Sequence, residues 1–185
     1  LSYFFIIVFL VRFAGEISIG NDYNFDIDHE MYFGSRLLNG ELLYTNELND
    51  KLPFVQFIFA IPAYFKNVGI WIFFSTLLSL TASLSLFKSL NNLLILYFPN
   101  LKKIDLLSIS KITSCFYLFS ISTTHEIGMI NHFAASSCLL TLCLSINCYT
   151  QKNKFSRIRN IILSAFFGAM SISIRPYYIA PIILI

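Results

Sequence analysis

The sequence predicts an all-α fold, a polytopic bundle of membrane-spanning helices. Of its 185 residues, 56% are hydrophobic and only 12% are charged, whereas a soluble domain carries about 25% charged residues. Its mean hydropathy is +0.69, and its apolar runs are too long for strands or ordinary core helices. Lipid cannot satisfy the polar groups of an open backbone, so the segments that cross the membrane must be helices.

The apolar runs set the expected elements in order. We expect spans near 2–19, 70–87, 105–123, 129–149 and 160–174, followed by a truncated span at 177–185. The first run lacks a basic n-region and a small-residue cleavage site, which favours an anchor over a cleaved signal peptide. The chain begins without Met and stops inside a hydrophobic run. We therefore interpret residues 1–185 as one transmembrane domain, a fragment from the N-terminal part of a longer protein.

The long loop over 20–69 is expected to carry two short juxtamembrane helices. Apolar residues recur at helical spacing over 28–39, and Gly40 then offers a stop signal. Asp26 and Asp28 are expected to precede the first turn of this helix, where a carboxylate can cap backbone N–H groups. The apolar segment 52–65 has only fourteen residues and contains two prolines, so an interfacial or re-entrant helix is favoured over a span.

The charge distribution predicts the orientation. If 52–65 does not cross, one side of the membrane receives eight basic residues and a single acid, Asp105. The basic residues are Lys88, Lys102, Lys103, Lys111, Lys152, Lys154, Arg157 and Arg159. The other side receives the loop 20–69, with seven acids against three basic residues. The positive-inside rule makes the first side cytoplasmic. We expect a multi-pass protein of the plasma (inner) membrane with its acidic loop and active face outward.

This topology places four ionisable residues on the outer face although they are distant in sequence: Asp28, His125, Glu126 and Arg175. Ionisable groups gathered at one membrane face are a functional-site hypothesis by default. The four cysteines all fall in apolar segments without metal-ligand spacing. We expect them to pack between helices and predict no metal site from them.

Residues 25–57 carry several motifs in a fixed order. An acidic group follows the first span, then come "LLNGELLY" and "DKLP", which opens an apolar helix. This order resembles the first outer loop of the C-type glycosyltransferase (GT-C) superfamily, which includes protein O-mannosyltransferases and the aminoarabinose transferase of lipid A. In that family an Asp is followed by a Glu and, four residues after the Asp, by a Tyr.

This chain keeps the family pattern in part. Asp28 and Tyr32 have the family spacing, whereas Glu30 stands one place later than usual because His29 is inserted. The family also has Lys-Pro or Pro-Pro at the entry to the apolar segment, and here Leu52 separates Lys51 from Pro53. The resemblance covers the whole chain in layout and residues 26–57 in recognisable motif.

The resemblance implies an integral membrane enzyme. It would transfer a sugar, with inversion, from a polyprenyl-phosphate donor to a lipid, glycan or protein acceptor at the outer face. Its partners would be these molecules and membrane lipids, with no nucleic acid. Asp28 is the first choice for the general base, Asp26 the alternate and Glu30 a further candidate; such a base contributes roughly 10²–10⁴-fold in rate. Arg175 would stabilise the leaving phosphate or simply anchor the helix at the interface.

The remaining candidates have two interpretations each. His125 and Glu126 would orient the acceptor, contact phosphate or help Asp28 hold a divalent metal, or they would only begin the next helix. The cofactor stays open, with that metal as the candidate. Tyr32 would stack on a sugar or belong to an interfacial aromatic belt. Arg36 and Lys51 would meet phosphate or balance neighbouring acids.

Two other function classes stay open. The first is a non-catalytic polytopic membrane protein with the same fold. The second is a lipid or solute transporter, although transporters usually place their ionisable residues at the bilayer midplane, in broken helices. Here the acids are concentrated in a long loop, which favours the glycosyltransferase.

Overall fold

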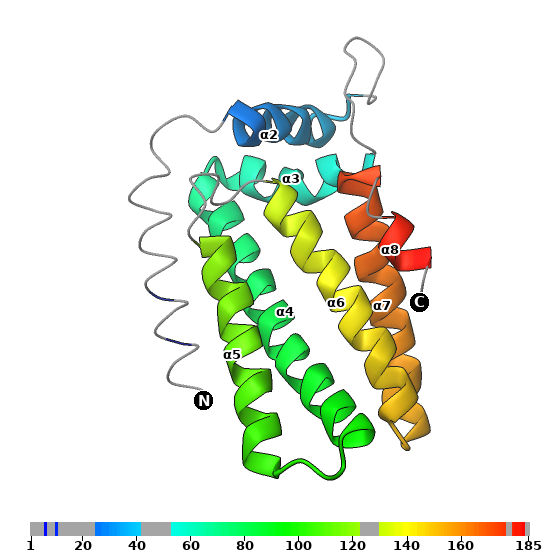
Figure 1. Ribbon diagram of the computed structural model, residues 1–185. Coiled ribbons are helices and arrows are strands. Elements are labelled where there is room, and N and C mark those ends of the chain that lie inside the picture. The colour runs from blue at the N-terminus through cyan, green and yellow to red at the C-terminus, as the bar shows by residue number, and fades with distance from the viewer. Residues whose placement is uncertain are drawn as a thin grey trace.

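The computed structural model describes residues 6, 10, 25–41, 53–122, 130–176 and 179–183, and every regular element in this part of the chain is a helix (Figure 1). The predicted all-α fold class is confirmed. The described helices are α2 (Phe25–Leu38), α3 (Pro53–Phe65), α4 (Val68–Tyr97), α5 (Lys103–Ser122), α6 (Ile130–Thr150), α7 (Lys154–Ile174) and α8 (Ile179–Ile183). The span expected over 2–19 falls outside the described residues except at positions 6 and 10.

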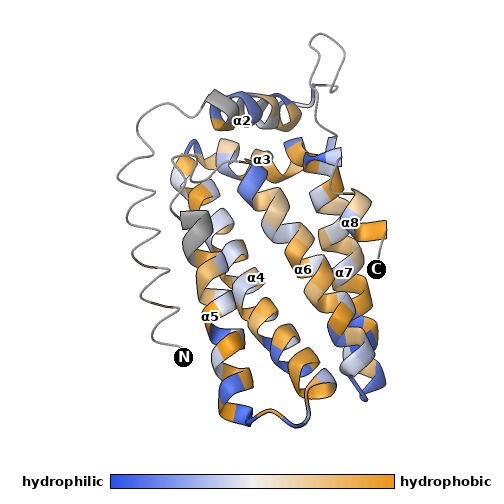
Figure 2. Cartoon of the chain, viewed as in Figure 1, coloured by the Kyte–Doolittle hydropathy of each residue, from blue (hydrophilic) through white to orange (hydrophobic). Residues whose placement is uncertain are grey.

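The four long helices stand side by side in a row with the order α5, α4, α6, α7 (Figure 1). Consecutive helices of the chain run in opposite directions, so the α4–α5 and α6–α7 connections lie at one end of the row. Figure 2 shows hydrophilic residues at the ends of these helices and mostly hydrophobic residues along their middle parts.

Helices α2 and α3 lie across the other end of the row, with α3 between α2 and the ends of the long helices (Figure 1). The indole ring of Trp71 in α4 fixes this arrangement. It stacks on Phe59 of α3 with ring centroids 4.1 Å apart, and its centroid is 4.8 Å from that of Phe133 in α6. The surrounding buried cluster consists of Ile27, Val55, Phe59, Trp71, Ile130, Phe133, Ala134, Met170 and Ile174.

Buried hydroxyl groups tie neighbouring long helices together. Ser79 of α4 and Ser136 of α6 have their Oγ atoms 3.0 Å apart, and Ser83 of α4 donates to the carbonyl oxygen of Ser114 in α5 at 2.7 Å. Between α6 and α7 the Oγ atoms of Ser145 and Ser164 are 2.7 Å apart. Lipid provides no hydrophobic force between helices, so small residues and such hydrogen bonds supply their association.

Three described helices are long and apolar enough to cross a membrane: α4, α6 and α7. Their length and composition indicate a helical membrane protein. Helix α5 covers an expected span but is not among the three. Helix α3 has 13 residues, fewer than the roughly 20 that a span needs. Helix α4 has 30 residues, which at 1.5 Å per residue gives a length of about 45 Å.

Several boundaries differ from those expected. Helix α4 continues to Tyr97, beyond the expected end at 87, and α7 begins at Lys154 rather than near 160. The start of α7 is set by Asn153, whose Oδ1 accepts a hydrogen bond from the backbone N–H of Phe155 at 2.9 Å. This cap satisfies an N-terminal donor of the helix, so polar residues such as Lys154 enter the first turn although they do not continue the apolar run.

Candidate functional site

Helix α2 has a buried face and an exposed face. The buried face carries Ile27, Glu30 and Gly34, at the spacing of successive helical turns. Asp28 and Tyr32 are exposed and stand one turn apart. The helix therefore separates the acids that sequence analysis grouped together: Asp28 faces outward, whereas the side chain of Glu30 is 0% exposed.

Glu30 is held on the buried side of α2 next to an imidazole. Its Oε1 lies 3.5 Å from Nδ1 of His29. The His29 ring in turn contacts Phe33 edge-on, with ring centroids 4.9 Å apart and an interplanar angle of 71°. Because the Glu30 carboxyl is fully buried, an acceptor substrate does not reach it in this arrangement.

Gly34 follows Glu30 by one turn and marks the closest approach of α2 to α3. A Cβ atom at this position would stand 2.7 Å from the carbonyl carbon and oxygen of Phe59 and 2.8 Å from the backbone nitrogen of Ala60. Only glycine therefore fits here without a shift of one helix. Gly34 was not predicted from the sequence; its signal was a glycine inside an otherwise helical pattern, which often has a packing reason.

Asp28 and Tyr32 on the exposed face of α2 are followed one turn later by Arg36, whose side chain is only 13% exposed. The Arg36 guanidinium lies over the Tyr32 ring, 5.7 Å from its centroid, and its Nε donates to Oε2 of Glu41 at 2.5 Å. Arg36 thus pairs with a neighbouring acid in the structure, and its contact with phosphate stays a prediction. This ion pair and ring contact leave Asp28 as the exposed carboxylate on the described face of the helix.

Of the two predicted ends of α2, the C-terminal end agrees with the structure and the N-terminal end does not. Gly40 has φ of +77°, and the N–H groups of Gly40 and Glu41 donate to the carbonyls of Leu37 and Arg36. This is a Schellman ending, so the expected stop is confirmed. The expected start is wrong: the helix begins at Phe25, so Asp26 and Asp28 lie within its first turn rather than before it. Carboxylates there still interact favourably with the helix dipole.

Arg175 follows the last residue of α7, at the end of the row that α2 and α3 cover (Figure 1). Its Nε donates to Oδ1 of Asn131, in the first turn of α6, at 2.5 Å. Arg175 is half-buried and therefore joins two helix ends rather than only extending into headgroups. Asn131 was missed in the sequence; its signal was an amide at the start of an apolar run beside the expected outer connection.

The structure thus brings the exposed face of α2 and Arg175 to the same end of the helix row. Other predicted site residues lie outside what it describes: Lys51, His125, Glu126 and the side chain of Asp26. Among the side chains that are described, no group of three or more His, Cys, Asp or Glu residues is arranged to hold a metal ion.

Comparison with known proteins gives no relative: no protein-family model, no curated protein and no solved structure matches the chain.

Proposed function

We propose that the chain is the membrane domain of a C-type glycosyltransferase, which transfers a sugar from a polyprenyl-phosphate donor to a lipid, glycan or protein acceptor. The observation that carries the proposal is the placement of the acidic segment. It forms a helix that lies across one end of the membrane helices, stacked on α3, and it exposes Asp28 there. The resemblance of residues 26–57 to the first outer loop of that superfamily adds the reaction class.

The chemistry assigns one role to Asp28 and another to Arg175. The acceptor nucleophile attacks the anomeric carbon, its proton passes to the Asp28 carboxylate, and the bond from that carbon to the phosphate oxygen breaks. The leaving polyprenyl phosphate gains negative charge, which a guanidinium such as Arg175 stabilises. Asp28 has the access that this step needs because its side chain is exposed on α2.

Glu30 takes a different role in this proposal. Its carboxyl is fully buried and lies 3.5 Å from the His29 imidazole, so we assign it to positioning α2 on α3 rather than to proton transfer. Asp28 is thereby preferred over the other acids of the segment as the base. Asp26 remains the alternate.

The distribution of charge supports an outward active face. The described basic residues of the α4–α5 and α6–α7 connections gather at the end of the row opposite α2, with Asp105 the described acid among them. An excess of Lys and Arg near helix ends is typical of the cytoplasmic side. The end that carries α2, α3 and Arg175 would then face outward.

The experiment that tests the function compares Asp28→Asn with Asp105→Asn, an exposed acid at the opposite end. Membranes from cells that produce each variant receive undecaprenyl phosphate carrying a radiolabelled hexose or 4-aminopentose. Release of undecaprenyl phosphate is measured. We expect Asp28→Asn to lower the rate by roughly 10²–10⁴-fold, with Asp105→Asn near the unaltered protein. Equal rates in all three would overturn the assignment of Asp28, and no release from either donor by the unaltered protein would overturn the function.

A second experiment tests the orientation. In a background without the four native cysteines, single cysteines replace Asn39, exposed after α2, and Asn153, exposed before α7. An impermeant maleimide added to intact cells should label position 39 and leave position 153 unlabelled until the membrane is opened. Labelling of position 153 alone would reverse the proposed orientation.

A further inference from the structure

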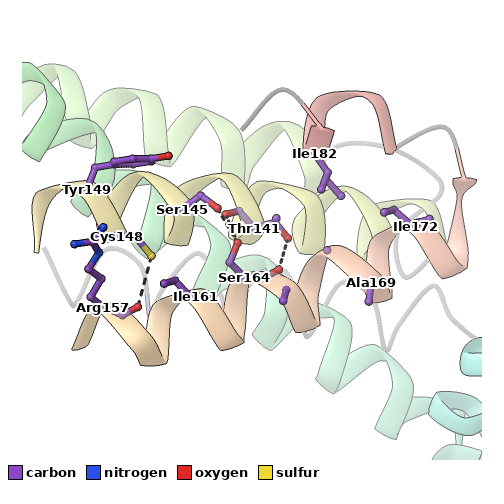
Figure 3. A pocket seen from close by; sticks show the side chains of 12 residues that line it. Thr141, Ser145, Cys148, Tyr149, Arg157, Ile161, Ser164, Ala169, Ile172 and Ile182 are labelled. Carbon is purple, nitrogen blue, oxygen red and sulfur yellow. Dashed lines mark hydrogen bonds between the residues drawn. The ribbon is translucent and has the colours of Figure 1, made fainter. Parts of the chain in front are cut away.

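A groove of about 600 Å³ runs between α6, α7 and α8, along α7 from the basic end of the helix row toward the end that α2 and α3 cover (Figure 3). Arg157, Tyr149 and Cys148 lie at one end of it, and Ile172 and Ile182 lie toward the other. The side chains that line it along α7 are largely exposed, as at Arg157, Ile161 and Ala169. The groove is therefore open along two helices that are long and apolar enough to cross a membrane.

The serine and threonine hydroxyl groups in the groove form hydrogen bonds with the protein itself. Ser145 and Ser164 bond to each other at 2.7 Å, Ser164 also donates to the Thr141 carbonyl at 3.1 Å, and Thr141 donates to the Ser137 carbonyl at 3.0 Å. Figure 3 shows the bonds that Ser164 makes with Ser145 and Thr141. Since these groups need no further hydrogen-bond partner, the lining of the groove offers a bound molecule mainly apolar contacts.

The groove has a cation at one end only. The Arg157 backbone carbonyl accepts from the Cys148 thiol at 3.7 Å, while its guanidinium is exposed. Among the described residues, no carboxylate forms an ion pair with it. Lys152, Lys154 and Arg159 are exposed nearby in sequence, so this end attracts anions and the other end does not.

The groove is longer than one leaflet of a bilayer. Arg157 and Ile172 are fifteen positions apart on α7, a distance of about 22 Å at 1.5 Å per residue. Half the hydrocarbon core of a bilayer is about 15 Å thick. An acyl chain whose headgroup lies at Arg157 therefore reaches the bilayer midplane before the groove ends.

We propose that this groove binds one anionic glycerophospholipid, with its phosphate on the Arg157 guanidinium and one acyl chain along Ile161, Ala169 and Ile172. Arginine matches phosphate oxygens in bidentate fashion, and basic pockets between transmembrane helices bind anionic headgroups. The apolar wall excludes a free phosphate as the main occupant because most of the groove would then stay empty. The proposal does not depend on the glycosyltransferase function.

The headgroup is tested with the full chain, purified in detergent and examined by native mass spectrometry. It is titrated with 1-palmitoyl-2-oleoyl phosphatidylglycerol or with phosphatidylcholine of the same chains. We expect one phosphatidylglycerol to bind more tightly than the rest, with Arg157→Gln weakening that site about tenfold, as for loss of a charged hydrogen bond. The matched control is Arg159→Gln, an exposed arginine that does not line the groove. Equal losses in both variants would overturn the site in favour of a diffuse basic surface.

The acyl chain is tested with Ala169→Phe, which fills the groove, against Leu163→Phe, an exposed position of α7 outside it. Only Ala169→Phe should weaken the tight phosphatidylglycerol site. Inorganic phosphate in the same titration should not displace the lipid. If Ala169→Phe binds as the unaltered protein does, or if inorganic phosphate competes fully, the groove is no lipid site and the guanidinium is only an anion site.

Discussion

Gly34 of α2 lies directly against the backbone of Phe59 of α3, so closely that a Cβ atom at position 34 would stand 2.7 Å from the Phe59 carbonyl oxygen. Phe59 in turn stacks on Trp71 of α4. A short series of contacts therefore runs from the exposed acidic helix to the membrane helices, and it depends on a position without a side chain.

Gly34→Ala should destabilise the protein. The added methyl group meets backbone atoms that cannot rotate away, and overpacking of this kind costs about 1–3 kcal/mol. Thermal unfolding in detergent micelles measures the effect, with Asn39→Ala, an exposed position near the end of the same segment, as the control. An unchanged melting temperature in Gly34→Ala would mean that α2 does not pack on α3 at this crossing.

Lys66→Gly should stabilise the corner between α3 and α4. Lys66 has φ of +51°, a left-handed conformation that costs a residue with a Cβ about 1–2 kcal/mol and glycine little. We expect a gain of about 0.5–1 kcal/mol in the free energy of unfolding. The contrasting variant is Lys88→Gly inside α4, which should lose about 1 kcal/mol. If both variants lose stability, the left-handed corner is not present.

Ser79 and Ser136 should show energetic coupling between α4 and α6. Their hydroxyls are 3.0 Å apart and buried, and interhelical bonds of this kind contribute about 0.6 kcal/mol in membranes. A double-mutant cycle with Ser79→Ala and Ser136→Ala measures the coupling. Ser108→Ala is the control, because Ser108 is exposed and bonds only within α5. Strict additivity of the two alanine variants would contradict the bond.

Arg175→Gln and Asn131→Ala should destabilise the protein to a similar extent, and their effects should not add. The two side chains share one hydrogen bond at 2.5 Å, and a bond to a charged group contributes about 1.5–3 kcal/mol. Unfolding of the two single variants and the double variant in the same detergent provides the measurement. Additive losses would mean that Arg175 acts on another partner.

The sequence allowed the fold class to be predicted because lipid reduces the choice to helices and because apolar runs mark their length. It placed α2, α3 and the stop at Gly40 within a few residues, from helical spacing and turn chemistry. The starts of α2 and α7 were missed because caps and first turns use polar residues, which look like loop. The hydrogen bonds between helices were not predicted either. Ser79 and Ser136 are distant in sequence, and no local sequence pattern indicates that they pair.

The membrane topology predicted which candidate residues share one end of the helix row. The predicted topology grouped Asp28 with Arg175 at one end of the helix row, because this grouping depends only on the number of membrane crossings between them. Which acid is buried depends on the rotation of α2 against α3, and that rotation is fixed by the contact of Gly34 with Phe59. Helical spacing alone did not show that Asp28 is exposed and Glu30 buried, because both residues lie beside the apolar face of α2.

The four long helices form a wall one helix thick, in the order α5, α4, α6, α7. A path for a solute needs helices on every side, because water inside a bilayer must be shielded from lipid all around. A single layer of helices does not surround a volume on all sides. Within the described helices, a path for a solute would therefore have to form between this layer and a second layer of helices. A reaction at the end of the row where α2 and α3 lie needs only the single layer.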